Sequence, residues 1–347
     1  MPDLLKLHVW NRVLTGWKSV EIIDSIEALA PTFSLGYSDR CLDSDGTLRV
    51  SPGDLCTVKL DDDVVLTGFV DDSDMSESAP DRSLGVSGRS RTGDLVDCAA
   101  LHKPTQWRNS TLDQIAADLC KPFEIAVKVA GSVGAAFPKF AIEPGETVQE
   151  CLARAARERG RLLLSSPEGD LVIASIGANR AKTALQRGVN IKSAILSLSM
   201  AERFSEVRVR SQADDEDLFG KPAAQIEVKA EDPNVKRYRP LVIMDDAAQG
   251  SPGLKARANW EVSSRLGRGS RLTLTVPGWR HDGQAWRANT LVHVRHDWLG
   301  IDAEMLVASV KLTLDDGGMV TTLELCPVEA FSPEPVSKKK KENATWP

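Results

Sequence analysis

The sequence lacks the features that direct a chain into or through a membrane. No window approaches the roughly 18 consecutive apolar residues that a membrane-spanning helix needs. The N-terminal residues 1–6 have no basic segment followed by an apolar core, which is the pattern of a signal peptide. We therefore expect a soluble chain that is made in the cytosol and has no membrane insertion of its own.

Cysteine is scarce and widely spaced. The six cysteines lie at least fifteen positions apart, and no C-x-x-C pair occurs. This spacing argues against a zinc ribbon, and a chain of 347 residues is long enough to bury a core without disulfide bonds. We expect reduced, buried thiols.

The chain also lacks a basic charge balance. It has 43 lysines and arginines against 49 acidic residues, for a net charge of −6, and its only lysine run is 338–341. Nucleic-acid binders usually carry a basic stripe, so we expect no specific nucleic-acid binding. Aromatic residues make up only 5%, with eight tryptophans against two tyrosines, a bias that favours buried anchoring contacts.

No catalytic or metal-binding motif is present. The five histidines are scattered, and His293 and His296 would point to opposite faces of a strand. The acidic clusters 61–63, 71–74 and 214–217 lack the glycine-bearing calcium loop, and we expect them to be solvated loop tips. Neither a G-x-S-x-G elbow nor a nucleotide-binding glycine loop occurs. The sequence predicts no catalytic residue, no metal and no cofactor, and a protein that is not an enzyme.

The first hundred residues read as short strands separated by turns. Apolar and polar residues alternate in several short stretches, whereas the polar residues 71–81 predict a loop. The predicted strands are 5–9, 20–22, 33–37, 58–60, 64–70 and 83–87. Many short strands with regularly spaced turns favour a barrel or a sandwich.

From about residue 98 to 184 the pattern changes to a small α+β unit. Apolar residues at helical spacing predict a helix over 112–119, which Ser110 or Thr111 can cap. A second helix begins at the capping box formed by Thr147 and Glu150. A hairpin follows over residues 162–174.

Residues 185–331 are again rich in predicted strands, with one helix over 253–266, and 332–347 form a solvated lysine-rich tail. The predicted strands are 195–198, 205–210, 225–228, 241–244 and 271–276. The stretch 288–310 weakly resembles 52–70, since each is a strand, a turn and a strand. Either this likeness is chance, or the chain contains two copies of one barrel.

A specific resemblance covers the segment Gly88-Arg89-Ser90-Arg91-Thr92-Gly93-Asp94-Leu95-Val96-Asp97-Cys98. It resembles the G-R-S-x-T-x-D-L-V-D-C signature of the phage Mu-like baseplate hub proteins of contractile tails. The other matching pieces, in order, are Gly16-Trp17, 26–35, 52–54, 143–147, 237–240, 257–261, Val276-Pro277-Gly278-Trp279-Arg280, Trp286 and Asn289. Together they span about residues 4 to 331.

The resemblance implies a mainly β fold with an α+β insertion: two tail-tube-like antiparallel β-barrels, over 1–97 and 185–331, plus the small α+β domain 98–184. It implies a structural hub whose homotrimeric ring joins the sixfold tail tube to the threefold spike. The implied partners are the chain itself, the tail tube protein, the central spike protein and other baseplate proteins. The implied location is the virion tail baseplate, after assembly in the bacterial host cytoplasm.

The signature residues have two possible roles. Gly88 and Gly93 would permit tight turns, and Leu95 and Val96 would be buried. The charged residues of the signature, Arg89, Arg91, Asp94 and Asp97, would pair either within the chain or across a subunit boundary.

An alternative function is a tail-associated protein that binds the cell wall or degrades peptidoglycan. Eight tryptophans are compatible with stacking on sugars. Sugar-binding platforms expose their tryptophans, whereas those of a hub should be mostly buried.

Overall fold

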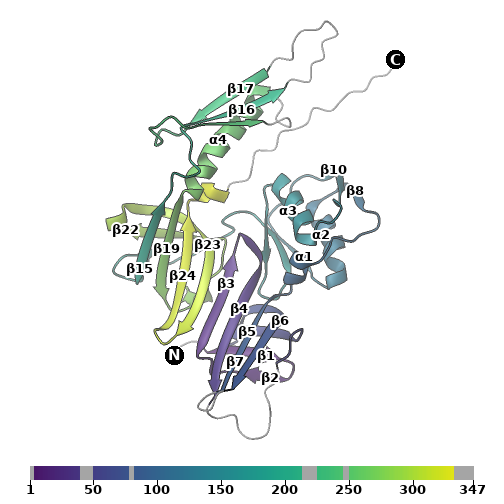
Figure 1. Cartoon of the computed structure of the whole chain (residues 1–347), viewed down its shortest axis with the longest axis vertical. Coiled ribbons are helices and arrows are strands. Elements are labelled where there is room, and N and C mark those ends of the chain that lie inside the picture. Colours follow the sequence, from purple (N-terminus) through teal and green to yellow (C-terminus); the bar gives the residue numbers. More distant parts are fainter. Residues whose placement is uncertain (1–3, 40–49, 78–81, 213–224, 245–249, 332–347) are drawn as a thin grey trace. The chain divides into compact units, whose positions relative to one another are not determined.

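The computed structural model describes residues 4–39, 50–77, 82–212, 225–244 and 250–331, and the chain divides into two compact units. The larger unit comprises residues 1–157, 161–195 and 272–325, and the smaller one comprises 158–160, 196–271 and 326–347. Figure 1 labels their elements. The predicted tail 332–347 and the acidic cluster 214–217 lie outside the described residues.

One 14-stranded sheet forms the body of the larger unit. Its strands alternate buried and partly exposed residues, as in β1, because one face packs into a core. The strands are β1 Leu5–Val9, β2 Arg12–Leu14, β3 Ser19–Ser25, β4 Ala28–Asp39, β5 Leu55–Leu60, β6 Asp63–Glu77, β7 Arg82–Ser90, β13 Asn179–Arg180, β14 Leu185–Gln186, β15 Ser193–Leu198, β19 Ser270–Pro277, β22 Thr290–His296, β23 Ile301–Asp315 and β24 Gly318–Cys326.

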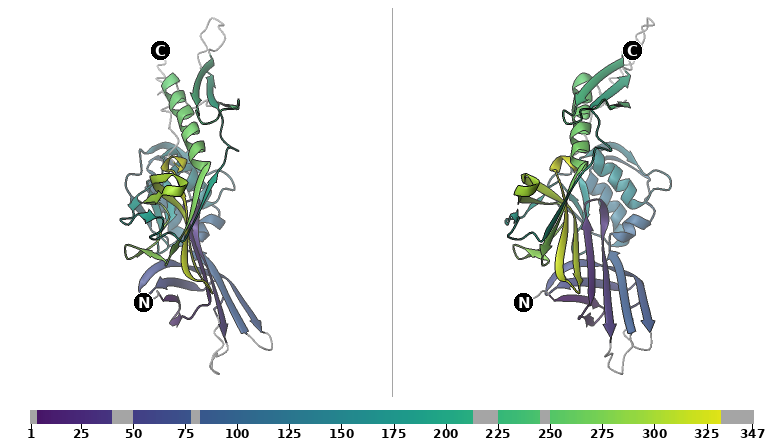
Figure 2. Two further views of the ribbon diagram at one scale, coloured as in Figure 1. Left: turned by 90° about the vertical axis from the view of Figure 1, so that its left-hand side faces the viewer. Right: turned by 60° about the vertical axis from the view of Figure 1, so that its left-hand side comes forward.

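The strand order of this sheet contains the same pattern twice. In the first half the order is β3-β4-β7-β6-β5, and in the second it is β15-β19-β24-β23, with β22 also paired to β23. The two halves meet where β23 pairs with β3 in antiparallel register. Figures 1 and 2 show this junction, with the yellow strands beside the purple ones. The stretches 52–70 and 288–310 thus fold as equivalent hairpins, β5–β6 and β22–β23.

The sheet is open in the described part of the chain. Its strand order runs from β15 at one end to β2 at the other without closing on itself. The mainly β class that the sequence predicts is confirmed, whereas a pair of closed barrels does not form from these strands.

Helices α2 and α3 of the larger unit lie in the predicted α+β segment 98–184, whereas α1 precedes it, and the three share a core of their own. Leu29 of β4 and Leu95 of α1 join the buried faces of α2 and α3 in this core. The elements are α1 Gly93–Asp97, β8 Gln106–Ser110, α2 Leu112–Cys120, η1 Lys121–Phe123, β9 Val127–Ala130, β10 Phe137–Ala141, α3 Val148–Glu158, β11 Leu162–Ser165 and β12 Leu171–Ala174. The Thr147–Glu150 capping box forms as predicted, and Thr111 and Gln114 form another.

The smaller unit is a three-stranded sheet covered on one face by a helix. Strand β16 (Glu206–Gln212) lies between β17 (Gln225–Glu231) and β18 (Pro240–Met244), and α4 (Gly250–Arg268) packs against the sheet. Val207 and Val209 of β16 are buried with Leu254 and Ala258 of α4. Four short elements complete the described part of the chain. The larger unit also contains β20 Arg280–His281, β21 Gln284–Ala285 and η2 Asp297–Leu299, and the smaller unit contains η3 Val328–Phe331.

One local prediction is wrong. The sequence predicts a loop over 71–81, but residues 71–77 continue strand β6 and pair with β7, and 78–81 lie outside the described residues. Their polar side chains are mostly exposed, so the strand carries no apolar alternation and depends on backbone pairing to β7. None of the described helices is long and apolar enough to cross a membrane.

Candidate interaction surfaces

The signature arginine Arg89 forms ion pairs within the chain. Strand β7 presents Arg89, whose Nε lies 2.8 Å from Asp71 of β6 and whose Nη2 lies 2.7 Å from Asp97 of α1. The guanidinium group lowers the pKa of Asp97, while burial raises the pKa of Asp94. Arg91 donates to the backbone carbonyl of Glu124 at 2.7 Å. Of the two roles considered for the signature charges, the geometry therefore supports pairing inside the chain.

The prediction of tight turns at Gly88 and Gly93 is wrong. Neither glycine has a positive φ, and Gly88 lies inside β7 whereas Gly93 begins α1. A Cβ at Gly88 would lie 2.1 Å from the carbonyl oxygen of Phe69 and 2.8 Å from the ring of Phe33. Gly88 is thus needed for the close approach of a neighbouring strand and a buried ring.

The remaining signature residues differ in burial. Ser90 is buried, and its hydroxyl lies 2.5 Å from that of Thr92. Leu95 is fully buried and Val96 packs against the same core, as expected. Cys98 is an exposed thiol.

Four of the other cysteines are buried free thiols, as predicted, whereas the exposed Cys98 departs from the prediction of buried thiols. Burial raises the pKa of Cys56, Cys120 and Cys151 to about 12 in each case. A thiol with so high a pKa is protonated at neutral pH and is a poor nucleophile. Cys41 lies outside the described residues.

The two Gly-Trp pairs anchor turns of the larger unit. Gly16 and Gly278 have φ of +82° and +70°, a backbone conformation that glycine adopts without strain. Trp17 and Trp279 follow them and are both buried. The indole of Trp279 donates to the carbonyl of Thr313 at 3.0 Å.

Arg280 fastens the second half of the large sheet to the first. Its guanidinium donates to the carbonyl of Leu60 at 3.0 Å and pairs with Asp63 at the tip of the β5–β6 hairpin. Arg287 donates to the carbonyl of Val65 in the same hairpin. The acidic tip 61–63 is predicted to be solvated, and its side chains are exposed. Asp61 and Asp63 also pair with Arg280, while Asp62 pairs with Lys6.

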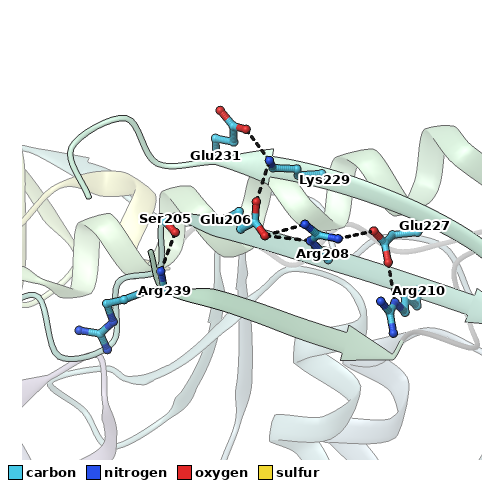
Figure 3. Close-up of polar contacts among 8 residues, drawn as sticks. All are labelled: Ser205, Glu206, Arg208, Arg210, Glu227, Lys229, Glu231 and Arg239. Carbon is cyan, nitrogen blue, oxygen red and sulfur yellow. Dashed lines mark hydrogen bonds and ion pairs between the residues drawn. The ribbon is translucent and has the colours of Figure 1, made fainter. Parts of the chain in front are cut away.

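The smaller unit carries a network of ion pairs on the sheet face opposite α4 (Figure 3). Glu206 lies 2.8 Å from Arg208 and 2.7 Å from Lys229. Glu227 lies 3.1 Å from Arg208 and 2.6 Å from Arg210. The basic partners lower the pKa of both Glu206 and Glu227.

Strand register explains this network. In β16 the charged side chains occupy alternate positions, and β17 places Glu231, Lys229 and Glu227 opposite them. On the other side β18 places exposed Val242 and Met244 opposite Arg208 and Arg210. The face therefore combines a charged surface with an apolar edge. The period-two charges in 206–210 and 227–231 are the sequence signal, which our prediction did not use.

The described residues contain no group of three His, Cys, Asp or Glu side chains placed to hold a metal ion. The histidines instead have separate partners: His293 lies 2.7 Å from Asp302, and His281 lies 3.3 Å from Asp282. His296 is buried and accepts a hydrogen bond from the backbone of Leu299.

Four of the seven tryptophans in the described residues are buried, Trp260 is half-buried, and Trp346 lies outside those residues. Trp17, Trp107, Trp279 and Trp286 are buried, whereas Trp10 and Trp298 are 79% and 75% exposed. Buried indoles contribute to packing and are inaccessible to a sugar.

Family models match most of the chain. The first domain of "Mu phage baseplate assembly protein GpP-like" matches residues 5–90, the second domain of "Baseplate hub protein gp44-like" matches 92–175, and the fourth domain of "Mu phage baseplate assembly protein GpP" matches 252–334.

Individual proteins are similar over nearly the whole length. The baseplate hub protein gp44 of Escherichia phage Mu is 36% identical over 95% of this chain and 89% of its own. The 43 kDa tail protein of prophage MuSo2 from Shewanella oneidensis is 34% identical, with a TM-score of 0.85 over 95% of this chain and 99% of its own. A tail protein from Neisseria meningitidis is 25% identical, with a TM-score of 0.80 over 96% of this chain and 99% of its own.

The fold and its surfaces therefore define a phage tail protein. More specifically, the chain belongs to the family of the Mu baseplate hub protein gp44, and it is a baseplate hub protein of a Mu-like phage. The family resemblance of the signature 88–98 is confirmed.

Proposed function

We propose that this chain is a structural, non-enzymatic hub of a contractile tail, and that three copies form a ring that joins the sixfold tail tube to the threefold spike. Its partners are further copies of itself, the tube protein, the spike protein and other baseplate proteins. Assembly takes place in the host cytoplasm, and the hub then resides in the virion baseplate.

The observation that carries this proposal is the repeated strand order of the large sheet. Each half presents a similar set of five strands, and the halves are fused in one chain. Three such chains offer six near-equivalent positions while keeping threefold symmetry, which is what an adaptor between a sixfold and a threefold assembly requires. In such a ring the open sheets would be joined edge to edge, so the tube-like barrels belong to the assembly.

The proposed hub has two tube-like domains and one α+β domain. We assign 1–97 and the large-sheet part of 185–331 to the two tube-like domains and 98–184 to the α+β domain. The inserted sheet and helix of the smaller unit extend the helical insertion that the sequence predicted.

The test is the molar mass of the purified chain by light scattering, alone and mixed with the tube protein. We expect a trimer, whose interfaces should each bury roughly 1,000 Å² or more. A chain that stays monomeric at about 100 μM, with and without the tube protein, would contradict the ring.

A further inference from the structure

The junction between the two halves of the large sheet shows how two such halves can be joined. Strand β23 pairs with β22 over residues 301–307 and then with β3 over 309–314. Strand β3 is thereby held between β4 and β23.

Strand β6 is the counterpart of β23 in the first half, and it has the same two parts. Residues 63–69 pair with β5, and the register to β7 shifts between Val70 and Asp72, where the second part begins. Residues 72–76 pair with β7, and no described strand lies on their other edge. The position that β3 occupies beside β23 is thus vacant beside β6 among the described strands.

Strand β15 is the counterpart of β3 in the second half. It pairs with β19 as β3 pairs with β4, and it is the terminal strand of the sheet in the described chain. Its Ile195 is 62% exposed. An exposed apolar edge strand is a template for pairing with another chain.

We propose that β15 of one copy pairs, in antiparallel orientation, with residues 71–76 of β6 in the next copy. Within one chain, β23 pairs with β3 at the junction of the two halves. The proposed contact is the equivalent pairing between two chains. The proposal rests on the ring proposed above and identifies its interface. The contact joins different surfaces on the two partners, so it is heterologous and can close a ring.

The chemistry of the two edges is complementary. The β6 edge carries Asp72 and Asp74, with Met75 exposed between polar residues. Strand β15 has no acidic residue, presents Ile195 to solvent and follows directly on Lys192. The backbone groups supply the ladder, while Met75 and Ile195 supply apolar contact.

Disulfide trapping tests this junction in the full chain. Each double variant combines Ile195→Cys with either Met75→Cys or Ser76→Cys, in a background with Cys41→Ser and Cys98→Ser. Side chains opposite each other in a ladder lie within about 5.5 Å at Cβ, so mild oxidation should give covalent dimers and trimers on a non-reducing gel. The matched control combines Ile195→Cys with Val13→Cys on β2, an exposed apolar residue at the other end of the sheet.

A charge pair provides a second measurement. Asp72 and Asp74 lie on the strand face opposite Met75, where an Ile195–Met75 register places the exposed Leu198 of β15. Leu198→Asp should therefore weaken the trimer about tenfold or more, whereas Leu198→Lys, equally polar at the same exposed site, should weaken it less. A trimer by light scattering that yields no link to β6, or links to Val13→Cys instead, would overturn this junction and leave the ring intact. A chain with neither a trimer nor any link would overturn both.

Discussion

At the scale of single residues, two glycines of β7 form a natural comparison. A Cβ at Gly88 would lie 2.1 Å from a backbone oxygen, whereas at Gly85 the nearest atom, the Asp74 Cβ, would be 3.6 Å away. We expect Gly88→Ala to lower the free energy of unfolding by about 3 kcal/mol, because backbone has to move. Gly85→Ala should change it by less than about 1 kcal/mol. Urea denaturation measures both, and equal effects would contradict this account.

The Arg280 clamp makes a second prediction at this scale. The Arg280 side chain is 21% exposed and bonds the Leu60 carbonyl and Asp63, so Arg280→Met should cost about 2 kcal/mol of stability. Arg180, which is 68% exposed in its ion pair with Glu304, is the matched control. Arg180→Met should cost less than about 1 kcal/mol by the same denaturation assay. If Arg180→Met lost as much stability as Arg280→Met, or more, the Arg280 clamp would not be what holds the two halves together.

The Arg89–Asp97 pair should appear in the pH dependence of stability. Because Arg89 lowers the pKa of Asp97 in the folded state, the carboxylate stabilises the fold above its unfolded pKa of about 4. This contribution is lost as the pH falls through the folded pKa. Asp97→Asn should therefore be less stable than the parent at pH 7, and the difference between their urea midpoints should shrink below about pH 4. A difference that is constant across pH would mean that the charge of Asp97 contributes nothing.

At the scale of elements, helix α3 depends on its capping box. The Thr147 hydroxyl accepts from the backbone of Glu150 at 3.2 Å, and Glu150 accepts from the backbone of Thr147 at 2.8 Å. Thr147→Ala should cost about 1 kcal/mol, while Thr147→Ser, which keeps the hydroxyl, should cost a few tenths. Thermal unfolding of the two variants separates a lost cap from a general effect of substitution at this site.

The elements also show what sequence can predict. The α3 capping box and the alternation in β1 are local signals, and both elements form where expected. The edge 71–77 of β6 gave no such signal, because an exposed strand paired on one edge needs no apolar pattern. The ion-pair network of Figure 3 depends on Glu206 lying opposite Glu231, a register that the alternation within each strand does not specify.

At the scale of the whole molecule, strand order is repeated where sequence identity has almost vanished. The stretches 52–70 and 288–310 share little beyond the placement of apolar residues and turns, yet each forms the hairpin at the same place in its half. Burial constrains side-chain volume and alternation far more than residue identity. The alternation of apolar and polar residues is therefore kept while the residues themselves differ. Whether the sheet closes was not predictable from the sequence, because closure depends on what pairs with the terminal strands β15 and β2, and local residue patterns do not specify that partner.

The last prediction distinguishes the hub from a cell-wall protein. Among the described tryptophans four are buried and Trp260 is half-buried, so within this part of the chain the exposed Trp10 and Trp298 are the best placed for sugar stacking. We expect the purified chain to stay in the supernatant when insoluble peptidoglycan is sedimented and to leave the turbidity of a peptidoglycan suspension unchanged. Sedimentation that is lost in Trp10→Ala or Trp298→Ala, but kept in an Arg180→Met control, would instead show a sugar-binding surface. Clearing of the suspension that is abolished by substituting a single Asp or Glu would show an enzyme and overturn the purely structural role.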